Sequence, residues 1–231
     1  MTMPRLVRVL LTIVATLSPL TPAFGQDTED GQVWAQLLAL GSLSENWRTH
    51  IELQPRIFDN ASELGLTIAR GAIGRRIAPG ATAFLGYAWV PRSLGPTTRH
   101  EQRLWQQLSL VFPARGAWTT TGRIRLEQRS LEPWTDRSHR LRLLARAQRA
   151  LGGRWTVAMY NEAMVTLDHT RLGPARGYDR NRLYGGMMRR LSPAFTAELG
   201  YLWENSTLPG PPQRNDHIVL GVMNIAFPTA R

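Results

Sequence analysis

The feature that most constrains the fold is an alternation of apolar and polar residues with a period of two. In residues 47–57, WRTHIELQPRI, every second residue is apolar, and Arg48, Glu52 and Arg56 lie among the polar residues between them. Residues 118–129, 140–148 and 195–204 repeat the pattern. A strict alternation over ten residues or so predicts β-strands, because successive side chains of a strand point to opposite faces of the sheet.

The length and charge of these segments favour a transmembrane barrel over a soluble β-sandwich with one wet face. Soluble strands average about 5–6 residues and transmembrane strands about 9–11, and the alternating segments are at least as long as the latter. Their polar face also carries several arginines per strand. The sequence therefore predicts an all-β fold, an antiparallel up-and-down transmembrane β-barrel of about 10–12 strands.

The number of strands in the closed barrel does not follow directly from the alternation. The alternation gives eleven segments, at 32–41, 47–57, 63–77, 80–90, 99–112, 117–130, 139–150, 154–167, 179–191, 194–204 and 216–227. Single-chain bacterial barrels have an even number of strands, so we expect either ten, with 32–41 outside the ring, or twelve, with one strand missed or merged. In 63–77 the apolar positions change face near Arg70 and Gly71, which predicts a bulge there.

The connections and aromatic residues predict a topology. Short turns at 43–46, 78–80, 113–116, 151–154 and 192–194 alternate with longer polar loops at 91–98, 131–138, 168–178 and 205–216. Four short turns are followed by an aromatic residue, Trp47, Trp118, Trp155 or Phe195. Short periplasmic turns, long external loops and a girdle of aromatic residues at one level are typical of outer-membrane barrels.

The two ends of the chain predict export and assembly. Residues 1–25 have a basic start, a short apolar run and a small-residue cleavage site, Ala23-Phe24-Gly25, and are expected to be a cleaved secretory signal peptide. Residues 26–231 then form a single barrel domain in the bacterial outer membrane, reached through the periplasm. The last strand resembles the C-terminal β-signal read by the barrel assembly machinery, with Val219, Met223, Ile225 and Phe227 on one face.

The net charge of the chain limits the classes of partner that it can bind. The net charge is +11 and falls to +9 without the signal peptide, and every basic residue is arginine. An exported chain whose arginines alternate with apolar residues does not suit nucleic acid. Arginine keeps its charge when desolvated and pairs bidentately with carboxylates, so it suits a confined interior. We expect outer-membrane lipids, the assembly machinery and small anions as partners, and no cofactor.

The candidate site is the polar interior of the barrel. The alternation directs the following residues inward: Arg48, Arg56, Arg123, Arg125, Arg129, Arg140, Arg142, Arg146, Arg180, Arg182, Glu52, Glu127, Glu162, Glu198 and Glu204. In one reading they form a charge-paired structural plug, since a barrel of 8–10 strands is only just wide enough for its own side chains. In the other, the excess of arginine lines a narrow channel that favours anions. Either way, the arginines of 123–129 and 140–146 need partners across the lumen, from Glu52, Glu162 or Glu198, or from anions.

A lipid-modifying enzyme, an acyl hydrolase or transferase, is the alternative class of function. Such enzymes use a Ser–His pair oriented by an acid or amide. The five histidines include the adjacent pair Ser138-His139, but neighbours on a strand point to opposite faces. A Ser–His pair between neighbouring strands stays open. No catalytic residue and no metal ligand set is predicted.

Five segments resemble one known family: QVWAQ at 32–36, RLWQQL at 103–108, RLRLLAR at 140–146, MYNEAM at 159–164, and DRNRLYGGMMRRLSPAFTAELGYLWE at 179–204. Together they are similar to the DUF2490 family of Gram-negative proteins, over essentially the whole mature chain. The resemblance implies an outer-membrane β-barrel of uncharacterised function. It implies no catalytic or ligand-binding residues.

Overall fold

The computed structural model describes residues 28–133, 136–170, 176–207 and 213–227. The signal peptide expected at 1–25 lies outside the described residues. Within the described part of the chain, no helix is long and apolar enough to cross a membrane.

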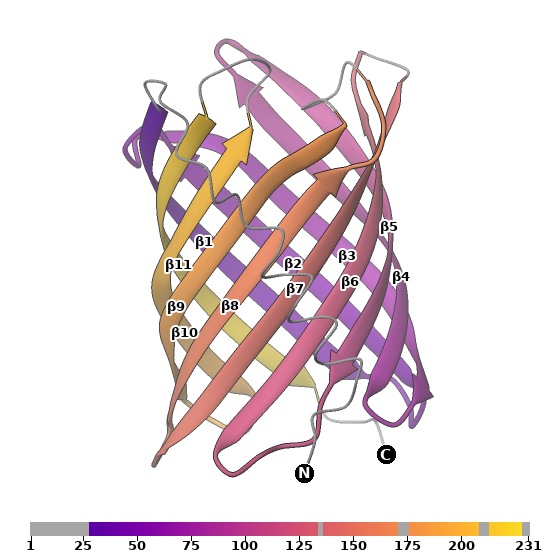
Figure 1. Cartoon of the computed structure of the whole chain (residues 1–231), viewed down its shortest axis with the longest axis vertical. Coiled ribbons are helices and arrows are strands. Elements are labelled where there is room, and N and C mark those ends of the chain that lie inside the picture. Colours follow the sequence, from indigo (N-terminus) through magenta and orange to yellow (C-terminus); the bar gives the residue numbers. More distant parts are fainter. Residues whose placement is uncertain (1–27, 134–135, 171–175, 208–212, 228–231) are drawn as a thin grey trace.

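The described residues form a closed β-barrel of tilted strands (Figure 1). The strands are β1 (Thr28–Ser42), β2 (Trp47–Phe58), β3 (Glu63–Ala78), β4 (Ala81–Leu94), β5 (Thr97–Val111), β6 (Trp118–Leu131), β7 (Arg137–Gly152), β8 (Trp155–Thr166), β9 (Gly177–Arg190), β10 (Phe195–Thr207) and β11 (Gln213–Phe227). They are 12–16 residues long, and most of them are longer than the segments read from the alternation. Consecutive strands pair in antiparallel fashion, which confirms the predicted all-β barrel.

The barrel closes between its first and last strands, which run parallel. The register extends from Thr28 opposite Arg214 to Gly41 opposite Phe227. The expectation of ten or twelve strands is therefore wrong, and the eleven segments read from the alternation are the eleven strands of the described chain. An even count is required only when every neighbouring pair is antiparallel. A single parallel pair lets an odd number close.

The connections divide into two sets at the two ends of the barrel. At one end, here called the girdle end, the connections are 43–46, 79–80, 112–117, 153–154 and 191–194. At the other, the loop end, they are 59–62, 95–96, 132–136, 167–176 and 208–212. The long loop expected at 91–98 is wrong, because β4 and β5 extend to within two residues of each other. Of the loop-end connections only 167–176 is clearly longer than those of the girdle end.

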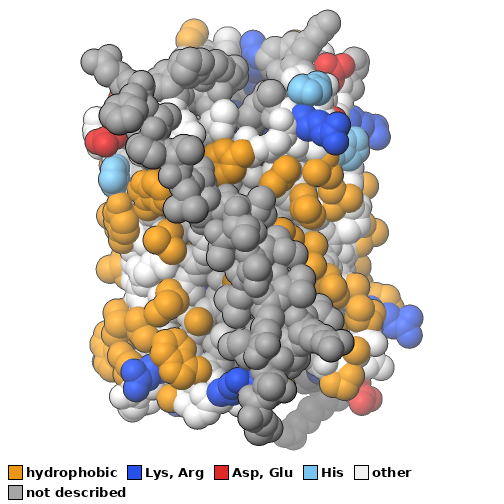
Figure 2. All heavy atoms as spheres, in the orientation of Figure 1, with side chains coloured by type: hydrophobic (Ala, Val, Ile, Leu, Met, Phe, Trp, Pro, Cys, Tyr) orange, Lys and Arg blue, Asp and Glu red, His pale blue; other side chains and the backbone are white. Residues whose placement is uncertain are grey.

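The outer face of the barrel is apolar (Figure 2). Leu199 is 63 % exposed, and Ile51, Leu85 and Leu183 are similarly exposed. The next residue along each strand points inward, which is the period that the sequence shows. An apolar outer face matches a hydrocarbon surrounding rather than water.

The interior is not polar throughout. One apolar cluster joins Leu66, Ile68, Ala88, Val90 and Trp105. A second joins Trp34, Ala158, Tyr184, Leu202, Ile218 and Leu220. The bulge expected near Arg70 and Gly71 is wrong for this reason: β3 keeps its alternation there, and its inward residues change from apolar to charged. The register shifts of β3 lie instead opposite Arg56/Ile57 and at Arg76/Ala78.

Candidate functional site

The interior of the barrel contains a closed cycle of alternating charges, here called the charge ring. Its members, each in contact with the next, are Glu127, Arg142, Glu162, Arg182, Glu204, Arg180, Asp179 and Arg140. The N–O distances around it are between 2.5 and 3.2 Å. Because each carboxylate contacts two of these guanidinium groups and each guanidinium two carboxylates, the ring is neutral in itself.

Five neighbouring strands, β6 to β10, supply the charge ring. Glu127 and Arg140 face each other across β6 and β7, and Arg182 faces Glu162 on one side and Glu204 on the other. Of the expected partners, Glu162 binds Arg123 and Arg142, and Glu198 binds Arg146. The third, Glu52, binds Arg70 instead. Asp179 enters the ring because a register shift at Met164/Val165 breaks the alternation beside it.

Nearly all members of the charge ring are buried. Glu127 is 0 % exposed, and all the other members except Arg180 are buried as well. Trp34 of β1 packs against the ring member Arg182, whose guanidinium carbon lies 5.0 Å from the centroid of the tryptophan ring, and against Arg56, at 3.6 Å. The charge ring lies in the loop-end half of the barrel, since Arg140, Asp179 and Glu204 are each within four residues of the loop-end limit of their strands.

Further charges surround the ring. Glu101 binds three arginines, Arg92, Arg103 and Arg129, at 2.6–2.8 Å. Arg125 is fully buried over the ring of Trp105, with its guanidinium carbon 4.3 Å from the centroid. Its Nε donates to Gln107 at 2.8 Å, and its Nη1 lies 3.7 Å from Glu127.

Two cavities lie on either side of the charge ring. The larger has a volume of about 1010 Å³ and extends toward the girdle end. The smaller, on the loop-end side, has a volume of about 240 Å³. Trp34, Arg56, Arg142 and Arg182 line both cavities. One layer of side chains therefore separates them.

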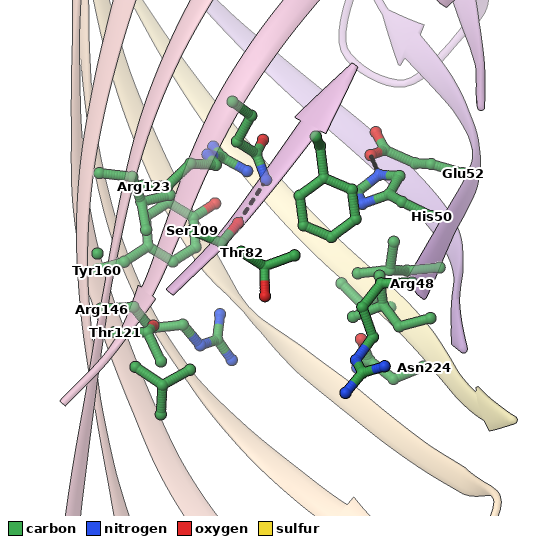
Figure 3. A pocket seen from close by; sticks show the side chains of 18 of the residues that line it. Arg48, His50, Glu52, Thr82, Ser109, Thr121, Arg123, Arg146, Tyr160 and Asn224 are labelled. Atoms are coloured by element: carbon green, nitrogen blue, oxygen red, sulfur yellow. Dashed lines mark hydrogen bonds and ion pairs between the residues drawn. The ribbon is translucent and has the colours of Figure 1, made fainter. Parts of the chain in front are cut away.

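The larger cavity is lined by basic and hydroxyl-bearing side chains that point toward one another from opposite walls (Figure 3). On one wall Arg123 contacts Glu162 at 2.5 Å, and Arg146 donates to both carboxylate oxygens of Glu198 at 2.8 and 2.9 Å. On the other wall His50 contacts Glu52, which also binds Arg70 at 3.1 Å. Arg48 donates to the carbonyl oxygen of Ser44 at 2.8 Å.

The structure places every charged residue of the candidate set on the inner side of its strand. Arg48 donates to backbone carbonyl oxygens and Arg56 to the amide oxygen of Gln54, and within the described residues neither forms an ion pair with a carboxylate. Sequence reasoning missed Glu101, Arg103 and Asp179. Glu101 and Arg103 did carry the period-two signal, in the segment 99–112, but the apolar Trp105 shares their inner face and obscured it.

The four aromatic residues begin their strands at the girdle end and point outward. Trp47, Trp118, Trp155 and Phe195 are the first residues of β2, β6, β8 and β10, and each is 39–45 % exposed. The residues of the expected β-signal lie on the outer side of β11, with Val219 and Phe227 exposed. This strand pairs with both β10 and β1.

The residues relevant to the enzyme alternative lie near the loop end. His139 contacts Asp168 through Nδ1 at 2.5 Å, and its backbone N–H donates to the same carboxylate. Partial burial raises the pKa of Asp168, but these hydrogen bonds outweigh it and hold the pKa below its ordinary value. The hydroxyl of Ser138 is 3.4 Å from the carboxylate rather than bonded to the imidazole. His139 and Asp168 therefore resemble the base and the acid of a catalytic triad, but Ser138 is not hydrogen-bonded to His139.

Comparison with known proteins agrees with this architecture. A curated relative, an uncharacterised protein of Methylorubrum extorquens AM1, is 28 % identical over 221 residues, which cover 94 % of this chain and 96 % of the relative. Among solved structures, the NanC porin superposes with a TM-score of 0.50 at 12 % identity, over 75 % of this chain and 85 % of the porin chain. At that identity the likeness concerns the fold. The model of DUF2490, described as a protein of unknown function, matches residues 31–215. The chain therefore belongs to the DUF2490 family.

Proposed function

We propose that this protein is an outer-membrane β-barrel whose lumen is held shut by the charge ring, with a basic cavity that opens toward the periplasm. The observation that carries the proposal is the closed cycle of eight charges, seven of them buried, in the loop-end half of the barrel. The apolar outer face, the aromatic residues at the girdle end and the porin-like fold support the membrane location.

The physical chemistry of the ring favours a closed lumen. Buried charges are stable only when they are paired and hydrogen-bonded, because each has lost its hydration. Arg142 shows the constraint: it donates to Glu127 through Nη1 and to Glu162 through Nε and Nη2. Moving it aside to open a path would leave two buried carboxylates each short of a partner.

A narrow channel that favours anions is the second candidate. It is supported by the single layer of side chains between the two cavities, and by Arg48 and Arg56, which add positive charge and have no carboxylate partner among the residues that the structure describes. Basic side chains that line a constriction select anions. The two candidates differ in whether the layer is shut at rest.

Single-channel recording in a planar lipid bilayer distinguishes them. For the closed barrel we expect no steady conductance from the wild type, and steps from Arg142→Gln, since that change removes a member of the ring that lines both cavities. Arg137→Gln is the matched control, because Arg137 is exposed at the start of β7, away from the ring. Steady anion-selective steps from the wild type would contradict the closed lumen and support the channel.

A further inference from the structure

The outer surface at the girdle end repeats one pairing of side chains three times. In each case a tryptophan that begins a strand lies beside an arginine directly opposite on the neighbouring strand: Trp47 with Arg75, Trp118 with Arg149, and Trp155 with Arg189. The guanidinium carbons lie 6.0, 5.7 and 5.2 Å from the respective ring centroids. These three arginines are the outward cations of the rim, and none of them is among the inward arginines of the lumen.

The rim carries very little negative charge to neutralise these cations. In the described part of the chain, Glu45 is the one acidic residue at the girdle end that lies outside the lumen. Arg115 and Arg154 lie in the connections of the same end. In Figure 2 basic side chains lie at the lower edge of the apolar surface. Glu45 lies in the turn directly before Trp47, whereas no acidic residue of the described chain lies on the outer surface of this end beside the Trp118–Arg149 and Trp155–Arg189 pairs.

An apolar groove lies beside the third pair. It has a volume of about 810 Å³, and Leu151, Trp155, Met187, Leu191 and Leu199 line it together with Arg189 and with Glu198, whose carboxylate is ion-paired with Arg146 in the lumen. The groove is on the outer surface, between the end of β7 and the start of β10. Arg189 supplies the only positive charge among its lining residues, so the groove combines an apolar floor with a cation.

We propose that these pairs bind the phosphate groups of anionic phospholipids, and that the groove beside Arg189 accepts an acyl chain of one of them. An arginine held beside a tryptophan at the edge of an apolar band is at the depth of lipid head groups. Basic residues at that depth attract anionic lipids. Arginine suits the site because its planar donors match two phosphate oxygens.

This inference rests on the proposed membrane location, so insertion and lipid selectivity are measured separately. Insertion is scored by the heat-dependent migration of the barrel on gels after refolding into vesicles of phosphatidylcholine with a fifth of phosphatidylglycerol. Selectivity is scored by native mass spectrometry of the detergent-solubilised full chain, titrated with phosphatidylglycerol or with phosphatidylcholine. The test variant is Arg149→Gln/Arg189→Gln, and the control is Arg137→Gln/Arg176→Gln, which removes the same charge from the loop end.

We expect the wild type and the control to prefer phosphatidylglycerol, and the test variant to lose about fivefold in affinity per removed arginine, the usual weight of one basic residue near an anionic membrane. Equal binding of the two lipids by the wild type would overturn the lipid site, as would an equal loss in the control. Failure of the wild type to insert would overturn the membrane location, and the lipid site with it. A test variant that inserts normally yet loses its preference supports the site itself.

Discussion

Replacing Glu127 with glutamine tests whether the charge ring stabilises the barrel. Glu127 accepts two hydrogen bonds from Arg140, at 3.1 and 2.6 Å, and one from Arg142 at 2.9 Å. A hydrogen bond to a charged group contributes about 1.5–3 kcal/mol. The glutamine amide keeps one acceptor oxygen and turns an N–H group toward the guanidinium groups, so the equivalent of about two bonds is lost. The loss leaves buried arginines with too little negative charge.

We therefore expect Glu127→Gln to lower the free energy of unfolding by about 3–5 kcal/mol, the usual cost of removing one partner of a buried ion pair. The measurement is an unfolding titration of the barrel in lipid vesicles with guanidinium chloride, monitored by tryptophan fluorescence. Glu63→Gln is the matched control, because Glu63 is exposed at the start of β3, and it should change the free energy by at most about 0.5 kcal/mol. A loss for Glu127→Gln no larger than that of the control would refute the stabilising role of the ring.

Two further predictions concern packing and pH. A Cβ at Gly200 would lie 2.4 Å from the carbonyl oxygen of Gly185, so Gly200→Ala should lower the free energy of unfolding by about 1–3 kcal/mol in the same titration. Gly221 has open space around it, so Gly221→Ala should lower it far less. Similar losses for the two variants would contradict the close approach of the strands at Gly200. Asp168→Asn should lower the unfolding midpoint at about pH 7. Because its folded pKa lies below the ordinary 3.8, the contribution is present above that value and is lost as the pH falls through the folded pKa. The difference from the wild type should therefore shrink progressively as the pH is lowered below 3.8, and a difference that stays constant over this fall would exclude this origin.

The strands could be predicted from the sequence because the lipid-facing side of a barrel is uniform. The outward positions of β2, such as Ile51 and Leu53, are apolar at every second residue, and this needs no knowledge of the neighbouring strand. The β1–β11 closure could not be predicted in that way. It joins residues about 185 positions apart, such as Thr28 and Arg214, and nothing local to either strand specifies a parallel pair.

The sequence predicts which face of the sheet the side chains of the candidate site occupy, but not which ion pairs they form. The period of two fixed which side Arg140 and Arg142 face, whereas their partners depend on register. A shift of one residue in β9, beside Asp179, decides that this carboxylate contacts Arg140. The inward Trp34 and Trp105 were also hidden, because an apolar residue on the inner face looks the same in sequence as one that faces lipid.

The parallel pairing of β1 with β11 has a consequence for how the strands insert into the membrane. Connections at the loop end join β2 with β3, β4 with β5, β6 with β7, β8 with β9 and β10 with β11, so ten strands form five hairpins with that end as their tip. β1 has no hairpin partner there. Its first residue, Thr28, lies at the loop end, beside Arg214, while β11 ends at the opposite side. If the chain inserts hairpin by hairpin, β1 is therefore the one described strand that must cross the membrane without a hairpin partner. The sheet closes into a barrel only when β1 pairs along β11.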